Sequence, residues 1–198
     1  MRSRILTIGL LLAGLLFNAK SVWSQKQAIG VRLGNPVGIT YKRDLSKSRA
    51  LEFLIGTSSS GWSSNYYKNS FSAHKRYDDF VYRSHRISGT AYFQGRYLFQ
   101  YNIPIEGMEG TLDWYWGIGA MLKVATLDYV YANPEVPQAT INDRYTDIDL
   151  GPEGMAGMEY TFQDIPLELF GEVSLLVEFA DRPLTLRTFG AVGARLQF

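Results

Sequence analysis

Residues 184–198, LTLRTFGAVGARLQF, decide the fold class of this chain. Apart from Thr188, the even positions are apolar or small, whereas the odd positions include Arg187, Arg195 and Gln197. Alternation with a period of two is the pattern of a β-strand that has one apolar and one polar face. A strand of this length exceeds the roughly 5–6 residues usual in globular proteins and is sufficient for a tilted strand crossing a bilayer, which needs about 9–11. The stretch therefore predicts a membrane-spanning β-strand.

The same alternation recurs upstream, for example in residues 87–101, where Ile87 and Phe93 are expected on the apolar face. A soluble β-sandwich also alternates, but long strands favour apolar side chains that face lipid instead of a core. We therefore predict an all-β fold, an eight-stranded antiparallel up-and-down transmembrane β-barrel. The eight expected strands are residues 27–34, 37–44, 50–57, 86–101, 112–125, 154–162, 166–179 and 184–198.

The strand count depends on Gly34-Asn35-Pro36, which is either a tight turn or a kink within one long strand. Proline cannot donate a hydrogen bond within a central strand, and a closed bacterial barrel needs an even number of strands. Both arguments favour the turn, which places both ends of the barrel domain on the periplasmic side.

The N-terminal residues predict export. Arg2 and Arg4 precede an uncharged apolar run at residues 5–17, and Val22-Trp23-Ser24 fits a signal-peptidase site. An N-terminal membrane anchor is the alternative, but thirteen apolar residues fall short of the roughly 20 that a spanning helix needs. We expect a cleaved signal peptide at residues 1–24 and one barrel domain at residues 25–198.

Composition excludes several classes of function. Removing Arg2, Arg4 and Lys20 from the 20 basic residues leaves 17 against 19 acidic ones, which offers no electrostatic attraction for nucleic acid. The chain has no cysteine, so a disulfide and a lipoprotein anchor are both impossible. A mean hydropathy of −0.11 suits a barrel, because only alternate residues face lipid.

Two sets of side chains follow from the expected strands. Aromatic residues on the lipid-facing side gather at the periplasmic strand ends, where amphipathic rings favour the headgroup level. Charged residues of both signs point inwards, and buried charges must be paired, so we expect a structural salt-bridge network in the lumen. The predicted girdle comprises Tyr97, Phe99, Tyr101, Trp114, Trp116, Tyr160, Phe162 and Phe198. The predicted network comprises Arg32, Lys42, Glu52, Arg96, Asp113, Lys123, Glu159, Glu168, Glu172, Glu178, Arg187 and Arg195, with Glu168 and Glu172 meeting Arg195 and Arg187.

Short turns at residues 45–49, 102–111 and 163–165 should be periplasmic, and the long segments 58–85 and 127–149 should be outer loops. The first loop mixes rigid aromatics with Ser, Asn and Gly, as recognition surfaces do. The alternative is a protruding hairpin whose aromatics pack on one another or on lipid. The candidate recognition residues are Trp62, Tyr66, Tyr67, Phe71, Tyr77, Phe80 and Tyr82.

No catalytic, metal or cofactor site is expected. The histidines His74 and His85 share one outer loop with several serines and Asp78-Asp79, but proximity in a loop does not create a nucleophile and base pair. Asp147-x-Asp149-x-Gly151 lacks the full spacing of a calcium loop.

The last strand, with its alternate apolar residues and terminal Phe198, resembles the C-terminal signal of outer-membrane proteins that assembly machinery of the BAM type recognises. The stretches GVRLGNPVGITYK (residues 30–42), LDWYWGIGA (112–120) and GMEYTFQDIPL (157–167) resemble small, largely uncharacterised outer-membrane β-barrels of the OmpA/OmpX/OmpW kind. The resemblance implies the outer membrane of a diderm bacterium, contact with lipid or lipopolysaccharide, and a possible envelope protein partner.

Fold does not settle role in this class. We expect a structural or interaction role carried by the outer loops. A narrow channel or a conduit for small hydrophobes is the alternative, followed by a lipid A-modifying enzyme.

Overall fold

The computed structural model describes residues 26–58, 64–73, 75–178 and 185–198, with the backbone alone described at residues 64–66, 73, 136–138, 178 and 185. The predicted signal peptide, Trp62 and His74 lie outside the described residues. Neither helix of the described chain is long and apolar enough to cross a membrane.

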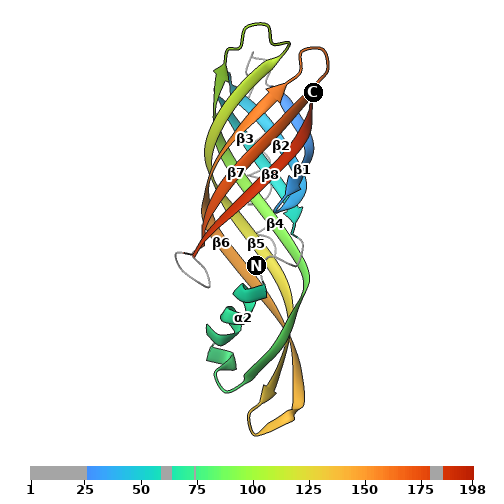
Figure 1. Ribbon diagram of the computed structural model, residues 1–198, viewed down its shortest axis with the longest axis vertical. Coiled ribbons are helices and arrows are strands. Elements are labelled where there is room, and N and C mark those ends of the chain that lie inside the picture. The colour runs from blue at the N-terminus through green and yellow to red at the C-terminus, as the bar shows by residue number, and fades with distance from the viewer. Residues whose placement is uncertain (1–25, 59–63, 74, 179–184) are drawn as a thin grey trace, which may run out of the picture.

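Eight antiparallel strands form one closed ring in which each strand pairs with its sequence neighbours and β1 pairs with β8 (Figure 1). This confirms the predicted eight-stranded up-and-down barrel. The strands are β1 (Gln27–Gly34), β2 (Val37–Ser46), β3 (Arg49–Thr57), β4 (Val81–Ile103), β5 (Thr111–Asn133), β6 (Val136–Thr161), β7 (Leu167–Glu178) and β8 (Thr185–Gln197).

The turn predicted at Gly34-Asn35-Pro36 is present between β1 and β2, whose nearest paired residues are Arg32 and Gly38. Gly34 has a φ of +151°, a conformation that residues with a Cβ rarely adopt. A Cβ at Gly34 would also collide with the backbone of Gly190 on β8. The Asn35–Pro36 peptide bond is cis.

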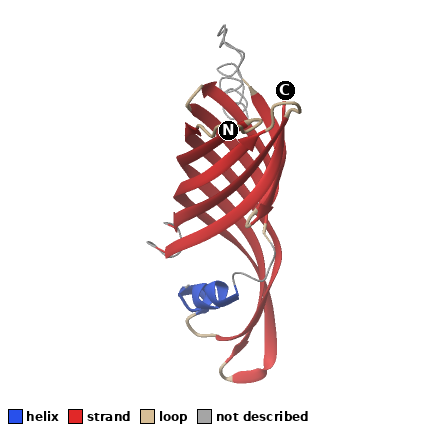
Figure 2. Ribbon diagram, turned by 45° about the horizontal axis from the view of Figure 1, so that its top comes forward, coloured by secondary structure: helices blue, strands red, loops and turns tan. Residues whose placement is uncertain are grey.

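The two ends of the barrel differ. Short connections at residues 47–48, 104–110 and 162–166 share one end with the C-terminus, at the top of Figure 1; we call this the turn end. At the opposite end β4, β5 and β6 continue far beyond the other strands (Figure 2). The continuations of β4, β5 and β6 and the short turns therefore lie at opposite ends of the barrel.

The segment 127–149, expected as a loop, is a β-hairpin. Strands β5 and β6 pair from Thr111 and Thr161 to Ala132 and Thr140 without a break in register, and they turn at residues 134–135. The prediction of a loop was wrong because the hairpin has no apolar face towards lipid. Its sequence therefore lacks the pattern by which the membrane-spanning strands were recognised. The segment 58–85 likewise holds α2 (Ser64–Ala73), η2 (Lys75–Tyr77) and the start of β4. We call residues 81–87, 127–133 and 136–145, together with α2 and η2, the extension.

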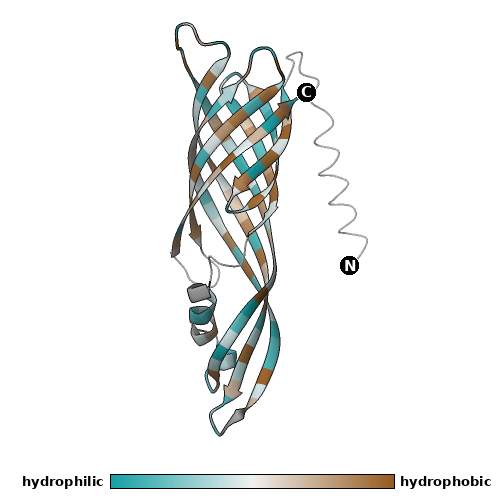
Figure 3. Cartoon of the chain, turned by 45° about the vertical axis from the view of Figure 1, so that its right-hand side comes forward, coloured by the Kyte–Doolittle hydropathy of each residue, from teal (hydrophilic) through white to brown (hydrophobic). Residues whose placement is uncertain are grey.

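The outer wall of the barrel is apolar. On the face of β4–β6, successive rows of paired outward residues include Tyr101–Trp114–Met158, Tyr97–Ile118–Gly154, Phe93–Leu122–Leu150 and Ala91–Val124–Ile148. Exposed residues elsewhere on the wall include Val31, Ile55, Val173 and Val192, each with 55–63% of its surface accessible. The brown and teal bands that alternate along the strands in Figure 3 follow this division. A tilted strand rises about 2.5 Å per residue along the barrel axis, so the interval from Trp114 to Val124 gives a band about 25 Å tall, as a bilayer core requires.

One residue of the predicted lipid-facing set lies on the other side. The register between β4 and β5 shifts between Ile87 and Gly89, and a β-bulge of this kind reverses the alternation of side chains. Ile87, opposite Leu127, therefore packs against the buried side chains inside the extension.

Candidate functional site

Arg96 of β4 is the centre of the charged interior. Its guanidinium group lies 3.2 Å from Glu52 of β3, 2.8 Å from Glu153 of β6 and 2.8 Å from Glu172 of β7. Glu172 also accepts a hydrogen bond of 2.8 Å from Nε of Arg32 on β1. All five side chains are fully or almost fully buried.

A second centre lies nearer the turn end. Arg195 of β8 pairs with Glu52 and lies 2.8 Å from both Glu159 of β6 and Glu168 of β7. Lys42 of β2 also binds Glu159 and lies 3.7 Å from Glu168. The guanidinium carbon of Arg195 is 3.8 Å from the centre of the Phe170 ring, so this cation is covered on one side by an aromatic face.

Several of these ion pairs cross the lumen, since they join β1 to β7, β4 to β7, β3 to β8 and β2 to β6, none of which are neighbours in the ring. The pairs Arg96–Glu52 and Arg195–Glu168 join adjacent strands. An eight-stranded barrel has an interior just wide enough for side chains to fill it. The paired charges therefore fill the lumen at this level, where the side chains of Arg32, Arg96, Glu52 and Glu172 have no exposed surface.

The structure places the predicted network residues in several different positions. Eight of them, Arg32, Lys42, Glu52, Arg96, Glu159, Glu168, Glu172 and Arg195, are brought together as described above. Asp113 lies apart at the turn end, where it accepts a hydrogen bond of 3.2 Å from Asn102, and Lys123 forms a separate group towards the extension. Glu168 meets Arg195 as expected, but Glu172 lies opposite Ala191 and binds Arg32 and Arg96, while Arg187 lies opposite Leu176. The side chain of Glu178 is outside the described set.

The separate group of Lys123 includes two residues assigned to a loop by the sequence pattern. Lys123 lies 2.5 Å from Asp149 and 3.8 Å from Asp147, and both carboxylates are buried. Their period-two spacing with Glu153 was the signal that could have placed them inside. Between this group and the larger network lies an apolar layer of Tyr92, Met121, Leu176 and Phe189.

A cavity of about 1030 Å³, lined mostly by polar and charged residues, opens at the turn end. Lys42, Glu159 and Glu168 contribute to its inner wall, and Asp44, Asp113 and Lys47 lie nearer its mouth. The cavity thus ends on the ion pairs of Arg195 and Lys42.

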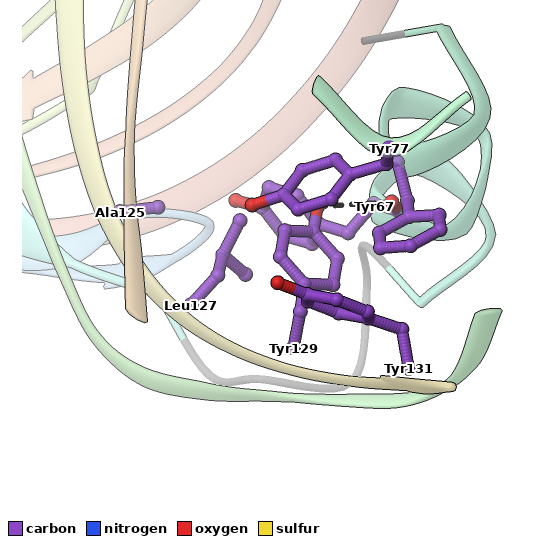
Figure 4. Close-up of a cluster of buried hydrophobic side chains, with 7 residues drawn as sticks. Tyr67, Tyr77, Ala125, Leu127, Tyr129 and Tyr131 are labelled. Carbon is purple, nitrogen blue, oxygen red and sulfur yellow. Dashed lines mark hydrogen bonds between the residues drawn. The ribbon is translucent and has the colours of Figure 1, made fainter. Parts of the chain in front are cut away.

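The described aromatic side chains of segment 58–85 pack inside the extension (Figure 4). Phe71 of α2 stacks on Tyr77 with ring centres 4.3 Å apart and also contacts Tyr129 and Tyr131 of β5 at 5.2 and 5.6 Å. The hydroxyl of Tyr129 donates a hydrogen bond of 3.0 Å to the carbonyl oxygen of Tyr67. We call Tyr67, Phe71, Tyr77, Ala125, Leu127, Tyr129 and Tyr131 the aromatic cluster.

This packing bears on the recognition surface that was predicted for segment 58–85. Of the candidate recognition residues, Tyr67, Phe71 and Tyr77 are buried, whereas Phe80 and Tyr82 are half-buried at the edge of the cluster. The three buried rings do not face solvent, so a partner would meet other residues of the extension. The side chain of Tyr66 is outside the described set, as is Trp62.

Tyr67 also connects the extension to the barrel. Its ring centre lies 4.9 Å from Nζ of Lys123, a distance typical of a cation–π interaction. Elsewhere in the extension, Asp143 of β6 lies 3.0 Å from Arg76 of η2 and accepts a hydrogen bond of 2.9 Å from Tyr77. The helix and the three strands therefore form one packed unit.

His85 belongs to this unit. Its Nδ1 lies 2.7 Å from the hydroxyl of Tyr82, and its ring makes edge contacts with Tyr67 and Tyr129 at 5.7 and 6.0 Å. Burial lowers the pKa of His85 below its ordinary value. No group of three or more His, Cys, Asp or Glu residues in the described part of the chain could hold a metal ion.

We therefore expect His85 to titrate below pH 6.5 in the folded protein. NMR spectra of protein labelled with ¹³C-histidine measure this titration, and a His74→Gln variant assigns the signal of His85. A lowered pKa means that the folded extension binds fewer protons than the unfolded one, so its full stability is present above about pH 6.5 and declines as the pH falls. The protection factors of the α2 amides, which correct for the pH dependence of intrinsic hydrogen exchange, should fall in acid. A pKa at or above 6.5 would contradict the buried position of the ring.

The predicted girdle residues lie on the outer wall at the turn end. Phe99 stacks on Trp116 with ring centres 4.3 Å apart, and Tyr101 stacks on Trp114 at 4.8 Å. Tyr97 packs edge-on against Phe99, and Tyr160 against Phe162. Phe198, at 71% exposure, follows β8.

A closed ring of eight strands, an apolar outer band and a charged interior define a transmembrane β-barrel of the outer-membrane type. No protein-family model and no curated protein matches the chain. Among solved structures it is similar to the N-terminal β-barrel domain of Pseudomonas aeruginosa OprF, with a TM-score of 0.48, 10% identity, and coverage of 88% of this chain and 96% of that one.

A major outer membrane protein of Thermus thermophilus gives a TM-score of 0.47, 12% identity, and coverage of 89% and 100%. The attachment invasion locus protein Ail of Yersinia pestis, solved with the heparin analogue sucrose octasulfate, gives 0.38, 8%, and coverage of 88% and 95%. Because each TM-score is below 0.5, the fold assignment rests on the strand ring of this chain itself.

Proposed function

We propose that this protein is a closed outer-membrane barrel that anchors the extension and presents it to a protein partner in the cell envelope. The observation that carries the proposal is the set of buried ion pairs across the lumen, above all those of Arg96 with Glu153 and Glu172. An interior filled in this way leaves the folded extension as the part available for interaction. The extension would face away from the periplasm, with the turn end and both ends of the barrel domain on the periplasmic side, since short inner turns and long outer segments are usual in such barrels.

The C-terminal strand supports the same assignment. Outward apolar residues Leu186, Val192 and Leu196 lead to Phe198, and β8 closes the ring by pairing with β1. We propose that assembly machinery of the BAM type recognises this strand after cleavage of residues 1–24. We propose no catalytic role for the extension. The ring of His85, a histidine within it, is packed among Tyr82, Tyr67 and Tyr129.

Conductance tests the closed lumen. Reconstituted in planar bilayers, the protein should give no stable conductance steps, and liposomes containing it should not swell in an isotonic solution of a small sugar. A 16-stranded porin, which has an aqueous channel, is the positive control. Reproducible steps together with sugar entry would favour the narrow channel instead.

Photo-crosslinking in native membranes tests presentation. A photoreactive amino acid at Asn142, exposed on β6 of the extension, should give a defined protein adduct. The matched position is Val31, which is 55% exposed on the lipid-facing wall and should give none. The absence of an adduct at Asn142, or the same adduct at Val31, would overturn the proposal.

A truncation gives the second test. Asp128 and Arg144 face each other in the β5–β6 ladder, so a two-residue Asn-Gly turn can join them in place of residues 129–143. With residues 64–80 replaced by a short Gly-Ser linker, the barrel should still fold, as judged by heat-modifiable migration, while the adduct from a photoreactive residue at Arg83 disappears. An adduct that persists would show that the partner binds residues outside the two deleted segments.

A further inference from the structure

The apolar band ends abruptly on the wall formed by β4, β5 and β6. Beyond the row Ala91–Val124–Ile148, the paired residues Thr126 and Thr146 form a row of hydroxyl groups. The next paired row across the three strands is Arg86–Asp128–Arg144. Lipid headgroups begin where the apolar band stops, so this charged row lies at their level.

The charged row is internally organised. Asp128 accepts a hydrogen bond of 2.9 Å from Nε of Arg144 and another from the hydroxyl of Ser88. The Arg144 side chain is 73% exposed and that of Asp128 is 34% exposed. Arg86 is exposed opposite Asp128, and within the described chain it has no carboxylate within 4 Å. The carboxylate thus holds Arg144 through Nε, while the terminal nitrogens of both arginines remain available to a ligand.

The described rim of β1, β2 and β3 carries no comparable charged row. At the same end of the barrel, the rim formed by β1, β2 and β3 carries the uncharged residues Asn35, Thr57 and Ser58, which bond to one another or to Thr90. Two arginines against one aspartate leave the row with a net positive charge. Guanidinium groups bind phosphate oxygens in pairs, and anionic headgroups attract such residues at the surface of a membrane.

We propose that Arg86 and Arg144 form a binding site for the phosphate monoester headgroup of a membrane lipid in the leaflet on the extension side. The acyl chains of this lipid lie along the apolar rows that end at Val124 and Ile148. Asp128 and Ser88 act as positioning residues. The site stands whether or not the extension binds a protein partner, because Arg86, Asp128 and Arg144 lie at the base of the extension, next to the apolar band.

Native mass spectrometry of the detergent-solubilised protein tests the site, with phosphatidic acid as the probe and diacylglycerol of the same acyl chains as the lipid without phosphate. The wild type should retain phosphatidic acid and not diacylglycerol. The R86Q/R144Q variant should retain about tenfold less phosphatidic acid. The R86K/R144K variant, which keeps the charge, should recover part of the binding.

The matched control is K75Q, which removes an exposed cation of η2 in the extension and should bind like the wild type. Heat-modifiable migration shows that each variant is folded. Wild-type binding by R86Q/R144Q, or loss of binding in K75Q, would overturn the proposal. Displacement of the lipid by millimolar inorganic phosphate would also overturn it, because the site would then recognise a free anion and not a lipid.

Discussion

Replacing Arg96 with methionine is expected to lower the free energy of unfolding by about 3–5 kcal/mol, because removing one partner of a buried ion pair leaves the other charge uncompensated. The cost should fall mainly on one carboxylate. Glu52 keeps Arg195 and the hydroxyl of Thr40, and Glu172 keeps Arg32. Glu153 keeps only the amide of Gln94, at 3.3 Å, among the described side chains.

The double variant Arg96→Met/Glu153→Gln should therefore recover most of the lost stability, since neither charge of that pair remains. Urea unfolding of the barrel refolded into phosphatidylcholine vesicles, followed by tryptophan fluorescence, measures both changes. Arg49→Met, at an exposed position of β3, should alter the unfolding free energy by no more than about 0.5 kcal/mol. A double variant less stable than Arg96→Met alone would show that Glu153 is not the residue left uncompensated.

The part of the fold in contact with lipid could be predicted from the sequence, because lipid constrains every second residue. Val192, Leu196 and Ile118 alternate with inward residues, and the band they form fixes strand direction, number and approximate length. The turn at Asn35–Pro36 could be predicted for a local reason, since proline interrupts a ladder. The charged interior could be predicted as a set of residues, because buried charge requires charge of the opposite sign.

The partners within that set could not be predicted. Glu172 meets Arg32 and Arg96 and not Arg187, because contacts across a lumen depend on the stagger of all eight strands, which no single segment encodes. Beyond the bilayer the constraint on alternate residues ends. Asn142, Asp143 and Arg144 are polar on both faces of β6, so a strand there resembles a loop in its composition.

The aromatic cluster illustrates a third limit. Tyr67 and Phe71 precede Tyr129 and Tyr131 by about sixty residues, and their contact arises because α2 folds back over the inward face of β5. The sequence placed aromatics in a polar segment, which is compatible both with a recognition surface and with a core. Tertiary packing decided between the two for Tyr67, Phe71 and Tyr77, which are buried.

Phe71→Ala is expected to detach α2 from the extension while the barrel stays folded. The ring is 2% exposed and contacts Tyr77, Tyr82, Tyr129 and Tyr131, and truncating a buried phenylalanine costs about 3–5 kcal/mol. A helix of 10 residues is not stable alone in water, so this loss should exceed what holds α2 in place.

Hydrogen exchange in residues 64–73 should therefore accelerate by at least about 100-fold, with faster proteolysis of the same segment. Amides of β1, β2 and β8 should be unchanged, because their ladders lie in the barrel. Ser72→Ala, at an exposed position of the same helix, is the matched control and should exchange like the wild type. Equal exchange in Phe71→Ala would mean that α2 is held by contacts other than the aromatic cluster, whereas loss of heat-modifiable migration would mean that barrel and extension fold as a single cooperative unit.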